Sequence, residues 1–485
     1  MPYNDLREFI ETLEKSGDLQ RIKEEVDWNL EAGAIMRKAN ESESPCVLFE
    51  NIKGCPMGYR LASGVLSTFK RLAIAMDINP DSTYNEILYE YVNRRGNRIK
   101  PMIVSDGPCK ENIIKGEEVD LLKFPVPMIH EGDGGRYIGT LDVGICKDLD
   151  SDWVNYGTYR LMVHDKNSTG IATPPAQHVG IIYAKYEGEG KPMPYVTCIG
   201  VDPIISFIAT TGVPYGVSEV DVAGGVRREP LKLVKCETVD LYVPATAEIV
   251  LEGEILPYER KNEGMFGEYS GYQIAERAPR PIFKVKCITH RNDPILTVSC
   301  IGIYRDDFLI AGLMGWSADL KEHLLELGIP ITGIYIPPES GAQLCIIATK
   351  TPYPRIANRI ASAIWGHKSG LWIPRVMVVN DDVDPTNMTQ VIHAFVTKCH
   401  PKTGTIVFDK SPGGVFTPFI DQFTEEMDEK GLMASGCNVL YDCTWRLNMK
   451  RIPVRSAFND IYPEEIKNRV LEKWEKYGFK SCMVD

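Results

Sequence analysis

The hydrophobic pattern of this chain changes near residue 315, and that change limits the folds it can adopt. From about residue 110 to 310, strand-like runs such as PYVTCIGVDP, LKLVKCETVDLYVP and AEIVLEGEIL are separated by glycine, proline and Asn-Asp turns. Many strands at this interval favour a barrel or a wrapped sheet. After residue 315, helix and strand patterns alternate, starting with ADLKEHLLELGIP and ITGIYIPP, which indicates a second, α/β unit.

The length also requires more than one packing unit. The chain has 485 residues, and single hydrophobic cores stop growing at roughly 250–300 residues. We therefore expect a multidomain protein of the α+β or α/β class. Its expected parts are an N-terminal α/β segment (1–110), a β-barrel-like domain (111–315), an α/β C-terminal domain (316–450) and a C-terminal helical arm (451–485).

Amphipathic helices are expected at both ends of the chain. Residues 4–16 place Leu6, Phe9, Ile10 and Leu13 at helical spacing, with Asn4 as the expected cap. The stretch YPEEIKNRVLEKWEKYGF predicts a last helix that opens at Pro463. This helix would pack on the body of the protein or on a partner subunit.

Composition excludes several classes of function. Fifty-four Lys and Arg against 66 Asp and Glu give a net charge of −12, so no basic field exists to attract nucleic acid or anionic lipid. The first residues carry acids and no apolar core, and no stretch approaches eighteen apolar residues, so we expect neither a targeting peptide nor a membrane span. Thirteen scattered cysteines without a C-x-x-C pair indicate buried thiols in a reducing cytoplasm.

Two carboxylates lie close together in the stretch NEGMFGEYSGY, residues 262–272. Glu263 and Glu268 are five residues apart, which places them on opposite faces of a strand or roughly 140° apart on a helix. An irregular loop could turn both toward one place if Gly264 and Gly267 take positive φ. A surface turn with solvated charges is the alternative from this stretch alone.

Other polar residues suggest an anion or metal site. Asn155 and Arg160 lie in VNYGTYRLMV, read as one strand, His178 opens a helix after TPPAQ, and Glu219 follows TTGVPYGVS. One His, one carboxylate and one amide oxygen could hold Mn²⁺ or Mg²⁺ together with a phosphate. A lone His at a helix start more often caps or packs, and Lys368 in WGHKSG could either meet a phosphate or be solvated.

The usual catalytic and nucleotide motifs are missing from the sequence. The glycines of GDGGRYIG have the wrong spacing for a dinucleotide loop, and WGHKSG lacks the first glycine of a phosphate loop. No G-x-S-x-G or H-E-x-x-H motif is present.

Taken together, these stretches resemble the UbiD-like decarboxylases, particularly the ferulic acid decarboxylase branch. The resemblance runs along most of the chain. It is carried by DLREFIETLE, LVKCETVDLYVPATAEIVLEGE, EGMFGEYSGY, HRNDPI, GHKSG and YPEEIKNRVLEKWEKYGF. The glutamate loop and the strand pair around DLYVPATAEIVLEGE are the specific motifs.

The resemblance implies a flavin-binding region with a split β-barrel-like core and prenylated FMN as cofactor. In this family Asn, His and Glu hold the cofactor phosphate through Mn²⁺ and K⁺, which match Asn155, His178 and Glu219, and a lysine that contacts the phosphate matches Lys368. The further cofactor-binding positions that we assign are Thr158, Tyr159, Arg160, Gln177, Thr210 and Thr211. Because Asn155 and Arg160 are five apart on the expected strand, a bulge would be needed for both to face one site.

The resemblance also implies a catalytic set of Arg160, Glu263 and Glu268. The flavin would be the electron sink, Glu268 the proton donor, and Arg160 with Glu263 the pair that positions the charged groups. The expected substrate is an aromatic, heteroaromatic or α,β-unsaturated acid, in a pocket partly shaped by Gly414 and Phe416 of SPGGVFTPF. Expected partners are CO₂, further copies of the chain as a dimer or hexamer, and a flavin prenyltransferase that supplies the cofactor.

Three alternatives remain at this point. The same site could run as a carboxylase in the CO₂-fixing direction. Glu263 and Glu268 could instead be the acid and nucleophile of a glycoside hydrolase, although none of the seven tryptophans lies beside them. The chain could also be a flavin carrier without chemistry, which the combination of both glutamates with Arg160 disfavours.

Overall fold

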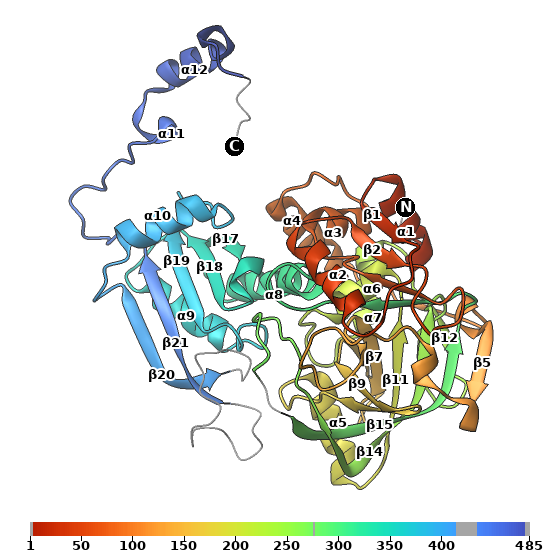
Figure 1. The fold of residues 1–485 in the computed structure, drawn as a ribbon. Coiled ribbons are helices and arrows are strands. Elements are labelled where there is room, and N and C mark those ends of the chain that lie inside the picture. The colour runs from red at the N-terminus through yellow and green to blue at the C-terminus, as the bar shows by residue number, and fades with distance from the viewer. Residues whose placement is uncertain (1–2, 275–276, 414–433, 481–485) are drawn as a thin grey trace.

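The protein consists of several packed α/β parts and a projecting C-terminal arm (Figure 1). The computed structural model describes residues 3–274, 277–413 and 434–480. The N-terminal part and a large curled sheet lie side by side, and helix α8 (Leu313–Glu326) leads from them to the C-terminal part. The fold is therefore a mixed α/β multidomain architecture with a half-barrel sheet.

The N-terminal part is a four-stranded sheet with helices. Its strands run in the order β1-β2-β3-β16, so a strand far along the chain completes it. The elements are α1 (Leu6–Lys15), β1 (Leu19–Ile22), α2 (Glu31–Glu41), β2 (Cys46–Phe49), β3 (Arg60–Ser63), α3 (Phe69–Ala75), α4 (Tyr84–Arg95) and β16 (Ile295–Val298). The first helix is amphipathic as predicted, but its cap is Asp5, whose side chain accepts from the Glu8 N–H, and not Asn4.

The central sheet has nine strands and carries the candidate site. Its main path is β6-β9-β10-β15-β14-β11-β7-β8, and β5 pairs with β15. The strands are β5 (Asn112–Lys115), β6 (Tyr137–Gly139), β7 (Asp142–Lys147), β8 (Val154–Gly157), β9 (Leu161–Asp165), β10 (Ser168–Ile171), β11 (Met193–Ile199), β14 (Ile249–Glu263) and β15 (Ala278–His290). A small sheet, β13-β12-β4, lies beside it: β4 (Met102–Val104), β12 (Lys232–Lys235) and β13 (Tyr242–Pro244).

The connection between β8 and β9 requires this sheet to curl. Five strands separate them in the sheet order, so in a flat sheet they would lie roughly 29 Å apart. Only residues 158–160 join them, and three residues reach at most about 11 Å. The sheet therefore bends until β8 and β9 approach each other. The expectation of one bulged strand over 154–163 was wrong, because the chain leaves the sheet at Thr158–Arg160 and re-enters it on another strand.

Three helices flank the central sheet and bring polar residues to this seam. They are α5 (His178–Gly188), α6 (Pro203–Ala209) and α7 (Glu219–Arg227). Helix α5 contacts β8 and β14, and α6 and α7 contact each other and β8. The first residues of α5 and α7 are His178 and Glu219, so the start of each helix delivers a ligand-type side chain.

The C-terminal part is a five-stranded sheet in the order β17-β18-β19-β21-β20. Its helices and strands follow the predicted alternation. They are β17 (Ile331–Tyr335), β18 (Leu344–Thr349), α9 (Ile356–Trp365), β19 (Arg375–Asn380), α10 (Met388–Lys398), β20 (Thr405–Gly413) and β21 (Ala434–Cys443). A π-helical turn, Phe308–Gly312, leads into α8.

The arm beyond β21 stands away from the body (Figure 1). It contains α11 (Phe458–Ile461) and α12 (Glu464–Glu472), and Pro463 is the N-cap of the latter helix, at its start as predicted. None of the described helices is long and apolar enough to cross a membrane. All described cysteines are free thiols and most are buried.

Candidate active site

The loop that joins Glu263 to Glu268 is held by close backbone contacts. Glu263 ends β14, and Gly264 has a φ of 100°, as expected for a glycine that turns the chain. Gly267 does not have positive φ; it is required because a Cβ there would lie 2.6 Å from the ring of His130. The Gly267 N–H also donates to Asp133 Oδ1 at 3.1 Å. The expectation of positive φ at Gly267 was therefore wrong, and its glycine serves packing.

Arg160 binds both carboxylates. Its Nε donates to Glu263 Oε1 at 2.9 Å and its Nη2 to Glu263 Oε2 at 3.1 Å, while its Nη1 donates to Glu268 Oε1. The guanidinium also lies over the ring of Phe266, with 5.2 Å between its Cζ and the ring centroid. Both glutamates are buried, so the spacing of five does not reflect a solvated surface turn.

Burial and the neighbouring charges shift the pKa values of Glu268 and Arg160. Burial raises the pKa of Glu268, and the Glu263 carboxylate raises it further, against the favourable charge of Arg160. Burial also opposes the charge of Arg160, but the two glutamates outweigh it and raise the pKa of the guanidinium. The cluster therefore holds a permanent cation beside a carboxyl group whose pKa is raised.

Asn155, His178 and Glu219 converge in a second cluster. His178 Nδ1 lies 3.0 Å from Asn155 Oδ1 and 3.6 Å from Glu219 Oε1. Glu219 Oε2 accepts from the Tyr156 N–H at 3.0 Å, which orients the carboxylate. All three side chains are buried, and burial raises the pKa of Glu219 against the hydrogen bond from His178.

Lys368 approaches this group from the C-terminal part. Its Nζ lies 3.0 Å from His178 Nε2 and forms no ion pair within the described part of the chain. Burial lowers the pKa of the ammonium. Glu219 and Asp319 act on this charge without a direct ion pair among the described residues, so the lysine can still bind a phosphate group.

These residues fit a divalent metal that carries a phosphate. In residues 3–274, 277–413 and 434–480, no group of three or more His, Cys, Asp and Glu could hold a metal, so an amide oxygen must complete the set. Asn155 Oδ1 and Glu219 Oε1 both face His178 Nδ1, and Mn²⁺ accepts such a mixture of oxygen and imidazole ligands. Trp153 and Tyr215 pack edge-on against the imidazole, with ring centroids 5.1 and 5.6 Å away.

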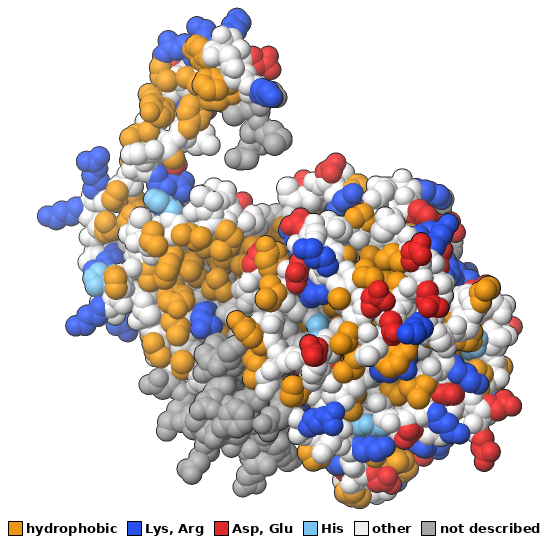
Figure 2. Space-filling view, viewed as in Figure 1, with side chains coloured by type: hydrophobic (Ala, Val, Ile, Leu, Met, Phe, Trp, Pro, Cys, Tyr) orange, Lys and Arg blue, Asp and Glu red, His pale blue; other side chains and the backbone are white. Residues whose placement is uncertain are grey.

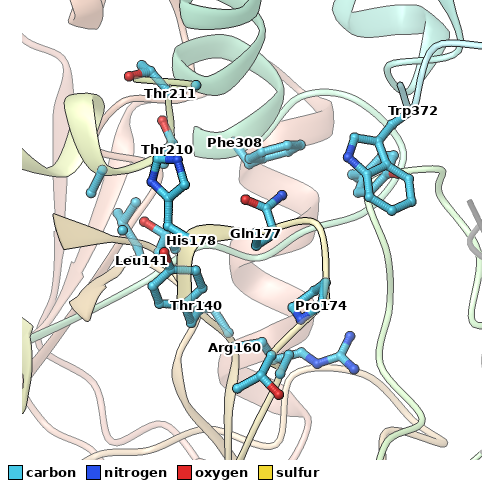
Figure 3. A pocket seen from close by; sticks show the side chains of 18 of the residues that line it. Thr140, Leu141, Arg160, Pro174, Gln177, His178, Thr210, Thr211, Phe308 and Trp372 are labelled. Atoms are coloured by element: carbon cyan, nitrogen blue, oxygen red, sulfur yellow. The ribbon is translucent and has the colours of Figure 1, made fainter. Parts of the chain in front are cut away.

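One cavity joins the two clusters (Figure 3). In this view His178 and Thr210 lie on one side, Trp372 lies on the other, and Gln177 and Phe308 lie between them. The predicted residues that line it are Asn155, Thr158, Tyr159, Arg160, Gln177, His178, Thr210, Thr211, Glu219, Glu268 and Lys368. Glu263 does not line the cavity but lies behind Arg160. The structure thus brings the predicted set together, apart from Gly414 and Phe416 of SPGGVFTPF, which lie outside the described residues.

Several lining residues were not predicted from the sequence. The cavity is also lined by the aromatic residues Phe266, Tyr269, Phe308, Trp316 and Trp372 and by Arg280. Arg280 lies at the start of β15, opposite Lys261 of β14. In the sequence, Arg280 lies between the motifs EGMFGEYSGY and HRNDPI and belongs to neither, so neither motif marked it.

Three models of one protein family match consecutive parts of this chain. The 3-octaprenyl-4-hydroxybenzoate carboxy-lyase N-terminal domain matches residues 10–91. The Rift-related domain of the same enzyme matches residues 102–304, and its C-terminal domain matches residues 312–443. Together they cover most of the sequence.

Individual relatives are similar over nearly the full length. The chain is 34% identical to ferulic acid decarboxylase 1 of Saccharomyces cerevisiae, over 99% of both chains. It is 33% identical to pyrrole-2-carboxylic acid decarboxylase of Pseudomonas aeruginosa, over 98% of both.

Solved structures show the same similarity in three dimensions. The closed form of vanillic acid decarboxylase of Sedimentibacter hydroxybenzoicus matches with a TM-score of 0.87 and 29% identity, over 99% of this chain and 100% of that one. A UbiD-class enzyme of Pelotomaculum thermopropionicum in complex with prFMN matches with a TM-score of 0.80 and 29% identity, over 94% and 98%.

Proposed function

The chain belongs to the UbiD family of carboxy-lyases, and from this premise we propose that it decarboxylates an aromatic, heteroaromatic or α,β-unsaturated acid with prenylated FMN and Glu268 as proton donor. The observation that carries this proposal is the contact of Arg160 with both buried glutamates at one end of the cavity. The residue division at 110, 315 and 450 stays a prediction.

The cluster of Asn155, His178 and Glu219 suits the cofactor phosphate. Asn155, His178 and Glu219 would hold Mn²⁺, and Lys368 would contact the phosphate as a point charge. K⁺ would share this cluster. When bound, the prenylated flavin would supply the electron sink that the chain itself lacks.

The protein residues would then donate a proton to the substrate and orient the proton donor. Loss of CO₂ breaks the bond between the carboxyl carbon and the substrate carbon, and the electron pair stays with the substrate. Glu268 would give its proton to that carbon. The carboxylate anion and one proton are thereby converted into the product and CO₂. Burial raises the pKa of Glu268 and so keeps this proton available. Arg160 would orient Glu268, while Glu263 fixes Arg160 through two hydrogen bonds.

The lining of the cavity supports a planar, conjugated substrate. Tyr269, Phe308 and Trp372 offer aromatic faces that suit a flat ring better than a saturated chain. The relatives named above act on ferulic and pyrrole-2-carboxylic acids by their names, which are both conjugated. The same residues would serve the CO₂-fixing direction, which is the alternative within this family.

The geometry disfavours a glycoside hydrolase. In such an enzyme the two carboxyl groups flank a sugar bond, with open space between them. Here Arg160 lies between Glu263 and Glu268, and only Glu268 lines the cavity.

The arm supports assembly into a homo-oligomer. It exposes the apolar side chains of Leu447, Ile452, Val454, Ile461, Leu471 and Phe479. Figure 2 shows hydrophobic side chains gathered along the projecting arm and a further hydrophobic patch on the C-terminal body. Such surfaces are usually covered in a stable protein, so we propose that the arm packs on a second copy in a dimer or hexamer. The prenylated flavin would come from a flavin prenyltransferase.

The proposal is tested by supplying the cofactor. The chain is expressed with and without a flavin prenyltransferase, and purified protein is mixed with a panel of conjugated and saturated acids. We expect CO₂ release only from the prenylated-flavin protein and only with conjugated acids. Bound cofactor is identified from its absorbance and mass spectra. Loaded protein that releases no CO₂ from any conjugated acid would refute the proposal.

A further inference from the structure

Arg280 is a second guanidinium in the catalytic end of the cavity. It lies on β15 two residues from the partner of Glu263, since Glu263 pairs with Ala278 and Lys261 with Arg280. Its Nε is 3.9 Å from Glu263 Oε2, and the side chain is 18% exposed. Within the described residues this long ion pair is its only polar contact, whereas Arg160 makes three hydrogen bonds.

The two guanidinium groups therefore differ in what they can still bind. All three nitrogens of Arg160 are used by glutamates. The donors of Arg280 are free of hydrogen bonds in the part of the chain that the structure describes, and Arg280 lines the cavity. Burial lowers the pKa of Arg280, so its charge is less compensated than that of Arg160.

The charges of the buried groups require a second cation when the substrate carboxylate binds. With Glu268 protonated, Arg160 and Glu263 cancel each other. A substrate carboxylate would then add one negative charge to a buried site, which is costly without a counter-ion. The other cation of the cavity, Lys368, lies beside His178 in the other cluster. Arg280 is the lining cation that can neutralise this charge near Glu263.

We propose that Arg280 binds the carboxylate of the substrate acid, while Arg160 is reserved for the two glutamates. This inference rests on the proposed function and deepens it. It makes recognition depend on charge: the acid is held by Arg280, and the neutral product, which has lost the carboxylate as CO₂, is not. Product release would follow from the loss of this ion pair.

The test measures binding rather than turnover. The parent is flavin-loaded Glu268→Gln, in which a neutral side chain replaces the proton donor, so the acid should be consumed at least about 10²-fold more slowly than by wild type. Dissociation constants are measured by calorimetry for pyrrole-2-carboxylate and for ferulate, each paired with its primary amide. The amide has nearly the same size and shape as the acid but no charge. The variants are Arg280→Gln, Arg280→Lys, and the control Lys286→Gln on the exposed side of the same strand.

The parent should bind at least one acid more tightly than its amide. Arg280→Gln should weaken that acid by about 10-fold or more and change the amide by less than about 2-fold, as loss of a charge-assisted pair requires. Arg280→Lys should recover part of the loss, and Lys286→Gln should match the parent. Flavin absorbance confirms that each variant is folded and loaded.

Three results would overturn the inference: equal weakening of acid and amide in Arg280→Gln, no weakening of either, or a parent that prefers neither acid to its amide. Equal weakening would show that Arg280 only supports Glu263. Absence of CO₂ release from wild type, combined with charge-dependent binding through Arg280, would instead refute the proposed reaction and leave this binding role intact.

Discussion

Replacing Glu268 by Gln separates the chemical role of this residue from its structural role. Glutamine has nearly the same shape, and its Oε1 can still accept a hydrogen bond from Arg160 Nη1. The bond keeps its charged donor but loses its charged acceptor, which costs stability by about 1–2 kcal/mol. The proton donor is lost completely, because Glu263 is buried behind Arg160 and does not line the cavity.

The expected loss of activity is much larger than the loss of stability. A missing general acid lowers turnover by about 10²–10⁴-fold, or about 3–5 kcal/mol in the activation barrier. The assay compares turnover at saturating acid, cofactor occupancy and thermal unfolding for wild type, Glu268→Gln and Glu259→Gln, an exposed glutamate on β14. Glu259→Gln should match wild type in all three.

The pH dependence gives a second test of the same role. Glu268 acts in its protonated form, and burial raises its pKa. Turnover of wild type should therefore be high at low pH and fall as pH rises through that raised pKa. Glu268→Gln should lack this fall. Wild-type turnover in a fully loaded Glu268→Gln protein, or an unchanged pH profile, would refute the reasoning.

Further predictions concern the metal, the arm and the substrate. His178→Ala or Glu219→Ala should lose Mn²⁺ and flavin together, because metal and phosphate share one site. Metal analysis and flavin absorbance measure both losses, with the exposed Glu189→Ala as control. Full flavin occupancy without Mn²⁺ would contradict this prediction. Deletion of residues 444–485 should reduce the mass measured by light scattering to that of a smaller assembly, and an unchanged number of subunits would show that the arm is not the contact. Gly414→Phe should weaken binding of the preferred acid by about 1–3 kcal/mol through a steric clash, yet the variant should retain flavin. The same ranking of acids in both proteins would place Gly414 outside the pocket.

Local patterns allowed much of the fold to be predicted from the sequence. The alternation of helix and strand from α8 to α10 depends on hydrophobic periodicity within each segment, so short windows were sufficient. The curl of the central sheet was only suggested by the many strands. The break at Thr158–Arg160 was missed because the stretch around it reads as one continuous strand, and only the sheet order forces the chain to leave it.

The candidate site shows the same limit. Family motifs gave Arg160, Glu263 and Glu268, and the structure places them in contact. Arg280 was not predicted because its position depends on the register between β14 and β15, and the sequence pattern did not determine that register. The role of Gly267 was also misjudged, since the close approach of His130 comes from a segment far away in the chain.

The most direct test of the proposed reaction follows the proton. Wild-type protein loaded with prenylated flavin is incubated with its preferred conjugated acid in D₂O, and CO₂ and product are quantified by mass spectrometry. The proposal predicts one CO₂ and one product molecule per acid consumed, with a single deuterium at the carbon that carried the carboxylate. In Glu268→Gln this labelled product should form at least about 10²-fold more slowly. Consumption of the acid without CO₂, or product without deuterium at that carbon, would contradict the account.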